Sequence, residues 1–112
     1  MTKTDTLYLQ HILDAIERIT RLIQGKNEQS FVSDEAVYNA SLYLLAVIGE
    51  AVGNVSEEYK EAHQEIPWRD IKDMRNILIH EYFGVSGGMI WKTLQNRLPG
   101  LENVVRASLL ER

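Results

Sequence analysis

Residues 75–82 read RNILIHEY, which sets Arg75, Asn76, His80 and Tyr82 among isoleucine and leucine residues. A histidine titrates near neutral pH and can move protons, whereas an arginine presents a permanent planar fork of donors that suits phosphate oxygens. Together they can cut RNA without a metal ion. His80 would pass a proton to or from the ribose 2′-hydroxyl or the leaving oxygen, and Arg75 would stabilise charge growing on the phosphoryl oxygens. Asn76 can donate to the same phosphate or orient the histidine ring.

The spacing of these residues places them along one flank of a helix. Asn76 and His80 are four residues apart and share a stripe, while Arg75 and Tyr82 are seven apart and share another. The predicted buried stripe of the same helix consists of Ile71, Met74, Ile77 and Leu78. A polar flank suits a groove between two helices, but a solvated helix edge has the same spacing. Spacing alone therefore does not decide between catalysis and a surface role.

The elements that position this flank are all predicted to be helical, so we expect an all-α antiparallel bundle of four to five helices in one domain, residues 1–112. A first helix ends at Gly25, and a loop covers residues 26–32. The remaining helices are expected over 34–62, 68–83, 89–98 and 101–111, with Ser86-Gly87-Gly88 as a loop and Pro99-Gly100 as a break.

The segment from Leu42 to Val52 is apolar on nearly every face, which predicts the central helix of the bundle or a subunit interface. Gly49 and Gly53 lie four residues apart and would let another helix approach closely. Trp68 and Trp91 each belong to an apolar stripe and are expected to anchor the core or an interface. So much apolar surface on a short chain predicts a homodimer through the helix over 68–83 and this apolar helix.

Composition limits the classes of function. The chain has 112 residues, a net charge of −4 and no cysteine, which excludes disulfides and thiolate chemistry. Residues 1–65 carry five Lys or Arg and 11 Asp or Glu, and residues 66–112 carry seven and five, so a polyanion is expected to meet the C-terminal half. The longest apolar run, LYLLAVIG, is too short for a membrane helix, and there is no signal-peptide pattern. We expect a cytoplasmic protein.

At these residues a family resemblance becomes visible. RNILIHEY resembles the R-x-x-x-x-H-x-Y signature of the HepT-like branch of HEPN proteins, with a polar residue directly after the arginine. Further segments resemble that branch in order and spacing: YLLAVIGEAV, IPWRDIKDMRN, HEYFGV and IWKTLQNRLPGL. One departure is Ser86-Gly87-Gly88, where the family often has an acidic residue after YFGV. This departure bears on the geometry near the tyrosine and on how a partner docks.

The resemblance implies a dimeric helical bundle that acts as a metal-independent ribonuclease toxin. It also implies an MntA-type nucleotidyltransferase antitoxin as partner, in a type VII-like toxin–antitoxin pair. Carried over by residue, it makes Arg75 and His80 the catalytic pair and Asn76 a supporting polar residue. Tyr82 becomes the acceptor of AMP groups. A second function class uses the same residues: a non-catalytic helical subunit that binds the nucleotidyltransferase and helps to present a nucleotide or another substrate.

Other candidate residues have two interpretations each. Glu50, within the apolar helix, is either a partly buried carboxylate paired with a basic side chain or a supporting residue near the active groove, opposite Arg75. His11 and Asp14 are three residues apart, but two ligands make a poor metal site, and surface polarity explains them. His63 is expected to be exposed. No metal-binding spacing is visible, so no metal or other cofactor is expected.

Overall fold

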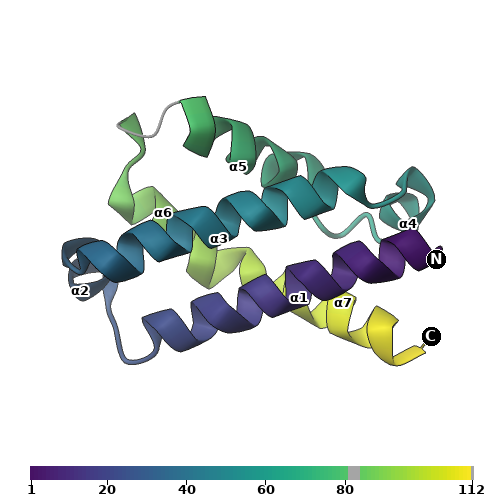
Figure 1. The fold of residues 1–112 in the computed structure, drawn as a ribbon, viewed down its shortest axis with the longest axis horizontal. Coiled ribbons are helices and arrows are strands. Elements are labelled where there is room, and N and C mark those ends of the chain that lie inside the picture. Colours follow the sequence, from purple (N-terminus) through teal and green to yellow (C-terminus); the bar gives the residue numbers. More distant parts are fainter. Residues whose placement is uncertain (81–83, 112) are drawn as a thin grey trace.

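The computed structural model describes residues 1–80 and 84–111, which form seven α-helices (Figure 1). Five of them are long: α1 (Lys3–Ile23), α3 (Glu35–Asn54), α5 (Trp68–His80), α6 (Gly87–Asn96) and α7 (Leu98–Glu111). Two have six residues each, α2 (Glu28–Ser33) and α4 (Glu57–Ala62). No residue in these ranges is in a strand, which confirms the predicted all-α class.

The three helices α1, α3 and α5 lie side by side with alternating direction (Figure 1). Helix α3 is the middle one, packed against α1 on one side and α5 on the other. Helices α6 and α7 follow one another behind this layer, α6 against α2 and α7 against α1. The core therefore lies between the layer and the α6–α7 pair, and α5 is held mainly by its contact with α3.

Helix α3 takes the central place because it is apolar over most of its circumference. Its buried apolar side chains are Leu42, Leu44, Leu45, Ile48, Ala51 and Val52, which confirms the prediction for this segment. By length and composition alone, Glu35–Asn54 would also be able to cross a membrane, although the central helix of a bundle meets the same test. In the fold it packs against two neighbouring helices. The close approach predicted at Gly49 is confirmed by its contact with α5.

The predicted helix over 34–62 is helical in nearly all of its range but is not continuous, because the chain breaks into α3 and α4 at Val55 and Ser56. Ser56 caps α4 through its hydroxyl, which accepts from the Tyr59 N–H at 3.2 Å. Its own N–H and hydroxyl donate to the carboxylate of Asp5, at 2.8 and 2.7 Å. Asp5 also joins Thr2 in the capping box of α1, so one buried carboxylate ties together the starts of two helices.

Three other boundaries differ from the prediction, two of them because a polar side chain caps the start of a helix. Asn27 and Ser30 form a capping box that starts α2 inside the predicted loop, with Phe31 buried beneath it. Ser86 caps α6, so the predicted loop Ser86-Gly87-Gly88 is in fact a helix start. The last break falls at Arg97 rather than Pro99, because a proline is tolerated in the first turn of a helix.

Candidate active site

Arg75 reaches from α5 to α3 and forms the best-defined polar contact of the predicted site. Its Nε donates to the Oε2 of Glu50 at 2.7 Å, and its Nη1 donates weakly to the Oδ1 of Asn76 at 3.4 Å. The pair expected of Glu50 is thus present, but the glutamate is not buried: its side chain is 60% exposed, and that of Arg75 is 41% exposed. An ion pair this open adds little stability but restricts the orientation of the guanidinium plane.

Two contacts occupy only part of the guanidinium. Arginine has five N–H donors, and among the described residues Arg75 uses one on Nε and one on Nη1. Within the part of the chain that the structure describes, the remaining donors have no partner and are available to a ligand. Glu50 therefore acts as a brace on one edge of the fork, and the opposite edge can bind a phosphate.

His80 is exposed at the last position of α5, five residues after Arg75. At the helical rise this separation is about 7.5 Å along the axis. Asn76 is exposed as well, whereas Arg75 is half-buried. The structure therefore brings Arg75, Asn76 and Glu50 into direct contact and leaves the His80 imidazole open to solvent further along α5. The predicted acceptor Tyr82 lies outside the described residues.

The predicted inward stripe of α5 is correct for two of its four members. Ile71 and Leu78 are buried, and Met74 packs partly against the core. Ile77 is 37% exposed, which contradicts its predicted burial. It lines a largely apolar cavity of about 310 Å³ between α3, α5 and α6. That cavity lies on the flank of α5 that carries Asp70 and Asp73, away from the Arg75 flank.

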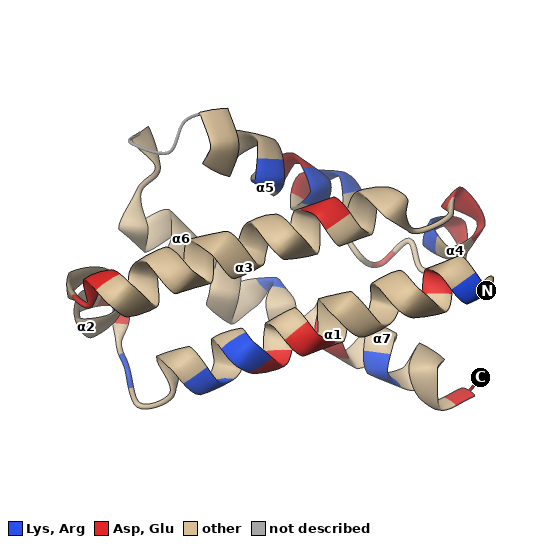
Figure 2. Ribbon diagram, viewed as in Figure 1, with Lys and Arg blue, Asp and Glu red and all other residues tan. Residues whose placement is uncertain are grey.

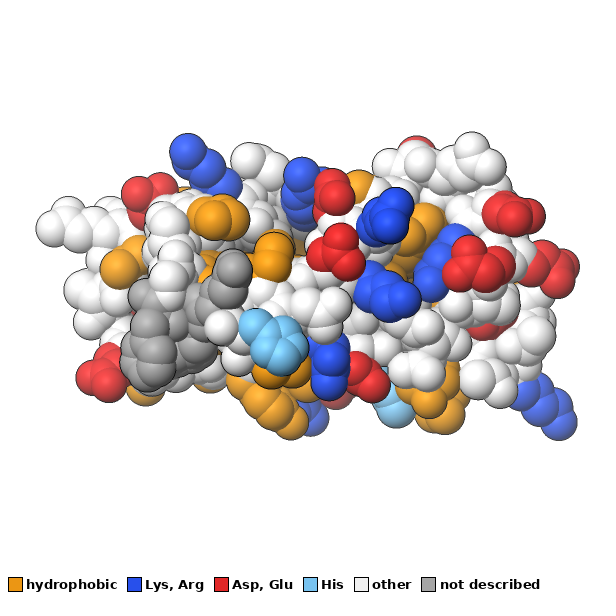
Figure 3. All heavy atoms as spheres, turned by 90° about the horizontal axis from the view of Figure 1, so that it is seen from above, with side chains coloured by type: hydrophobic (Ala, Val, Ile, Leu, Met, Phe, Trp, Pro, Cys, Tyr) orange, Lys and Arg blue, Asp and Glu red, His pale blue; other side chains and the backbone are white. Residues whose placement is uncertain are grey.

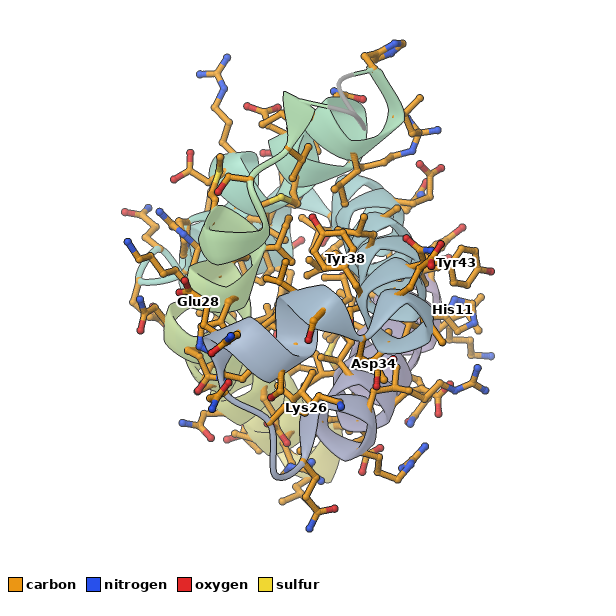
Figure 4. All side chains as sticks on the ribbon, turned by 90° about the vertical axis from the view of Figure 1, so that its left-hand side faces the viewer. His11, Lys26, Glu28, Asp34, Tyr38 and Tyr43 are labelled. Carbon is orange, nitrogen blue, oxygen red and sulfur yellow. The ribbon has the colours of Figure 1, made fainter. Side chains whose placement is uncertain are left out.

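A separate hollow of about 280 Å³ opens beside Arg75, between α1 and α3. Its walls include Tyr8 and His11 of α1, Tyr43, Val47 and Glu50 of α3, and Arg75. Figure 4 shows His11 and Tyr43 close together, both directed away from the bundle. The hollow thus joins a guanidinium and a carboxylate to two phenol rings and an imidazole.

Sequence reasoning missed the tyrosines of this hollow. Tyr43 belongs to a segment predicted to be apolar on nearly every face, yet its side chain is 69% exposed. A signal was available in the helical spacing: Tyr43 precedes Glu50 by seven residues and therefore shares its stripe. Tyr8 carries no comparable signal, because only the packing of α1 on α3 brings it to this place.

The remaining sequence candidates have structural roles. Asp14 pairs with Arg18 at 3.3 Å, and His11 lies edge-on to Tyr8, so these two do not form a pair of metal ligands. His63 is half-buried against the ring of Tyr59, at 4.4 Å between centroids, rather than exposed as predicted. Trp68 is buried and Trp91 packs against Phe31, which confirms both as core anchors. Within residues 1–80 and 84–111, no three acidic or histidine side chains gather as metal ligands.

Charge is divided between the two flanks of α5. Blue and red segments alternate along this helix in Figure 2. Arg69, Lys72 and Arg75 follow one another at three-residue spacing, while Asp70 and Asp73 line the apolar cavity on the other side. Viewed from above in Figure 3, histidine side chains (pale blue) lie along the lower edge among hydrophobic, basic and acidic ones. An anion would therefore approach α5 from its Arg75 flank.

Fold and site together define an all-helical protein with a braced arginine beside an open, aromatic hollow. The family model described as "Ribonuclease HepT-like" matches residues 12–108, so the chain belongs to the HepT-like ribonuclease family. It is 41% identical over 107 residues to the "Putative RNase" of Caldanaerobacter subterraneus subsp. tengcongensis, covering 96% of each chain. It is 37% identical over 102 residues to the "Probable ribonuclease HepT" of Thermococcus cleftensis, covering 91% of this chain and 93% of that one. No solved structure matches.

Proposed function

We propose that this protein is a metal-independent endoribonuclease that acts as the toxin of a toxin–antitoxin pair in the cytoplasm. The observation that carries the proposal is the Arg75 guanidinium, braced by Glu50 at 2.7 Å beside an open hollow, in a member of a ribonuclease family. A guanidinium with free donors suits a phosphodiester, and the basic residues of α5 lie on the same flank.

The proposed reaction is an attack of the ribose 2′-hydroxyl on the adjacent phosphorus. His80 accepts the proton of that hydroxyl, the new O–P bond forms, and the P–O bond to the 5′ oxygen of the next nucleotide breaks. The 5′ oxygen leaves with a proton, so the products are a 2′,3′-cyclic phosphate and a free 5′-hydroxyl. Arg75 stabilises the charge that develops on the phosphoryl oxygens, and Asn76 supports its orientation through the 3.4 Å contact.

The protein is proposed to act as a homodimer, with the RNILIHEY segments of two copies facing one RNA groove. Ile79, the residue before His80 on α5, exposes 51% of its area, which supports an interface along α5 and the neighbouring part of α3. A second His80 would also provide the second proton transfer that a single imidazole cannot perform at the same time. Sedimentation at micromolar concentration should show a dimer, and a monomer alone would rule out the shared groove.

The decisive experiment is RNA cleavage by the purified protein with EDTA present. The parent should cleave, while His80→Ala and Arg75→Lys should not, because an ammonium cannot reproduce the fork of donors. Both variants should keep the circular dichroism and unfolding midpoint of the parent, since both side chains are at the surface. An RNA with 2′-deoxy residues should resist cleavage. If His80→Ala cleaves as fast as the parent, the activity belongs to another residue or a contaminant.

Regulation is proposed to come from an MntA-type nucleotidyltransferase that adds AMP to Tyr82. The support is the match of the sequence to the family signature at this position, since Tyr82 lies outside the described residues. The alternative, a non-catalytic subunit that presents substrates to that enzyme, predicts no effect on growth when this chain is expressed alone. A toxin should stop growth, and His80→Ala should restore it.

A further inference from the structure

The hollow beside Arg75 gathers the aromatic surface of this protein. Of the seven described tyrosine, phenylalanine and tryptophan residues, Tyr43 is the one classed as exposed, with 69% of its area accessible. The others are buried or pack against the core, and half-buried Tyr8, which is among those that pack against it, also lines the hollow. A phenol ring left this open on a helix gains little packing energy within the fold, so its face is accessible to a ligand.

The rings of the hollow are arranged around a space of about 280 Å³. Tyr8 and His11 meet edge-on, with centroids 5.8 Å apart and planes at 86°, which restrains the imidazole. Tyr43 comes from the neighbouring helix and lies beside His11 (Figure 4). Arg75 closes one end of the same hollow, with donors that no other described residue occupies. A ligand that joins a planar ring to an anionic group could therefore contact the aromatic side chains and Arg75 at the same time.

We propose that this hollow is a nucleobase subsite: a base of single-stranded RNA stacks on Tyr43, against the Tyr8–His11 edge, while its neighbouring phosphate binds Arg75. Splayed bases of single-stranded RNA are commonly held on aromatic faces, and stacking tolerates any base because every base has a π-face. The proposal rests on the proposed ribonuclease function and adds residues from α1 and α3 to it. Tyr43 is thus a binding residue for the substrate rather than a catalytic one.

The charges of the hollow favour RNA over a second copy of the chain as its occupant. Glu50 and Arg75 line it with 60% and 41% of their side chains exposed. The buried centre of a protein interface is usually depleted of charged groups, whereas an arginine next to exposed rings is typical of nucleic-acid grooves. Docking a second copy here would bury this ion pair, and removing both charges from water is costly.

The test measures binding without cleavage, in a His80→Ala background. The probes are a labelled single-stranded RNA and a series of the same RNA, each lacking one base. Tyr43→Ala should weaken binding of the complete RNA by about 5- to 150-fold, the range expected for one stacked base. Tyr43→Ala should not change the binding of one RNA in the series, namely the RNA that already lacks the base that stacks on Tyr43. Tyr43→Phe should bind like the parent, since the ring remains.

A matched control is Leu110→Ala, which removes another exposed apolar side chain, 82% accessible, from α7. It should leave binding unchanged. The subsite is wrong if Tyr43→Ala weakens every abasic RNA equally, or if it converts a dimer to a monomer in sedimentation, which would mark the hollow as a self-association surface. If the parent cleaves RNA but Tyr43→Ala binds normally, only the subsite fails. If neither the parent nor the His80→Ala protein binds RNA, both the ribonuclease proposal and the subsite proposal fail.

Discussion

Gly49 on α3 lies directly against Arg75 on α5: a Cβ built on the glycine would be 2.8 Å from the Cβ of Arg75 and 3.1 Å from the carbonyl oxygen of Ile71. The first distance is shorter than packed carbon atoms allow and the second is tight, so the two helices approach this closely only because residue 49 has no side chain. The next residue, Glu50, is the partner of Arg75. The missing side chain therefore positions the ion pair of the candidate site.

Gly49→Ala should lower the free energy of unfolding by about 1–3 kcal/mol, because α5 must move away from α3 to admit the methyl group. Gly53→Ala is the matched control, since its Cβ would meet only the Lys72 side chain, at 3.6 Å. There the better helix propensity of alanine should leave stability unchanged or raise it by up to about 1 kcal/mol. Urea unfolding of both variants checks the prediction, and equal midpoints would contradict the close approach.

Glu50→Ala should reduce RNA cleavage by about 10- to 100-fold through loss of the brace on Arg75. RNA binding should not weaken, because the carboxylate repels phosphate, so the loss should appear in kcat rather than in KM. Glu50→Gln keeps an oxygen for the Arg75 Nε and should retain more activity than the alanine variant. A rise in KM with unchanged kcat would mean that Glu50 contributes to binding and does not position Arg75.

Tyr82→Phe should keep ribonuclease activity but escape modification by the nucleotidyltransferase and ATP. An AMP group would add bulk and at least one negative charge to the RNILIHEY segment, which would oppose the binding of RNA. Intact mass and peptide mapping give the readout. Tyr43→Phe is the control, because Tyr43 is an exposed competing tyrosine, and that variant should be modified like the parent. An adduct on Tyr82→Phe as heavy as on the parent would exclude Tyr82 as the acceptor.

Asp5 should make the fold sensitive to acid. Burial raises the pKa of its carboxyl, but the hydrogen bonds from Ser56 and Thr2 outweigh that effect, and the pKa lies below its ordinary value. The unfolded chain therefore takes up the proton first, so this stabilisation is present above about pH 4 and is lost as the pH falls through the lower pKa of the folded state. Asp5→Asn should cost about 1–3 kcal/mol at pH 7 and flatten the acid dependence. The control is Asp14→Asn, at an exposed site, which should change neither the stability at pH 7 nor its acid dependence. Urea unfolding at pH 7, 4 and 3 measures both effects.

Ser41→Ala should stabilise the protein by about 1–2 kcal/mol. The hydroxyl of Ser41 is fully buried in α3 and has no hydrogen-bond partner among residues 1–80 and 84–111, and alanine is the better helix former. The matched control is Ser108→Ala, which removes the 2.7 Å bond to the buried Tyr59 hydroxyl and should cost about 1–3 kcal/mol. Thermal unfolding compares the two, and destabilisation by both would mean that Ser41 has a partner.

The sequence was sufficient to predict the long helices and the order in which they follow, because periodic burial is a local property of the chain. The apolar segment from Leu42 to Val52 predicted a central helix or a subunit interface, and the packing of α3 between α1 and α5 confirms the central position. Where prediction failed, short-range side-chain bonds decided the outcome. Asn27 and Ser86 each start a helix in a predicted loop, and Ser56 interrupts a predicted helix. Ser56 does so with the help of Asp5, 51 residues away, which no local pattern contains.

The same division applies to the candidate site. Arg75, Asn76 and His80 are one short motif, so their placement on a single helix follows from the sequence alone. Only the tertiary structure decided that Arg75 contacts Glu50 and shares a hollow with Tyr43 and His11. These residues lie on three different helices, and their meeting depends on how closely α5 and α1 pack on α3. That distance is set by side-chain volumes at the contact, above all by the absence of one at Gly49.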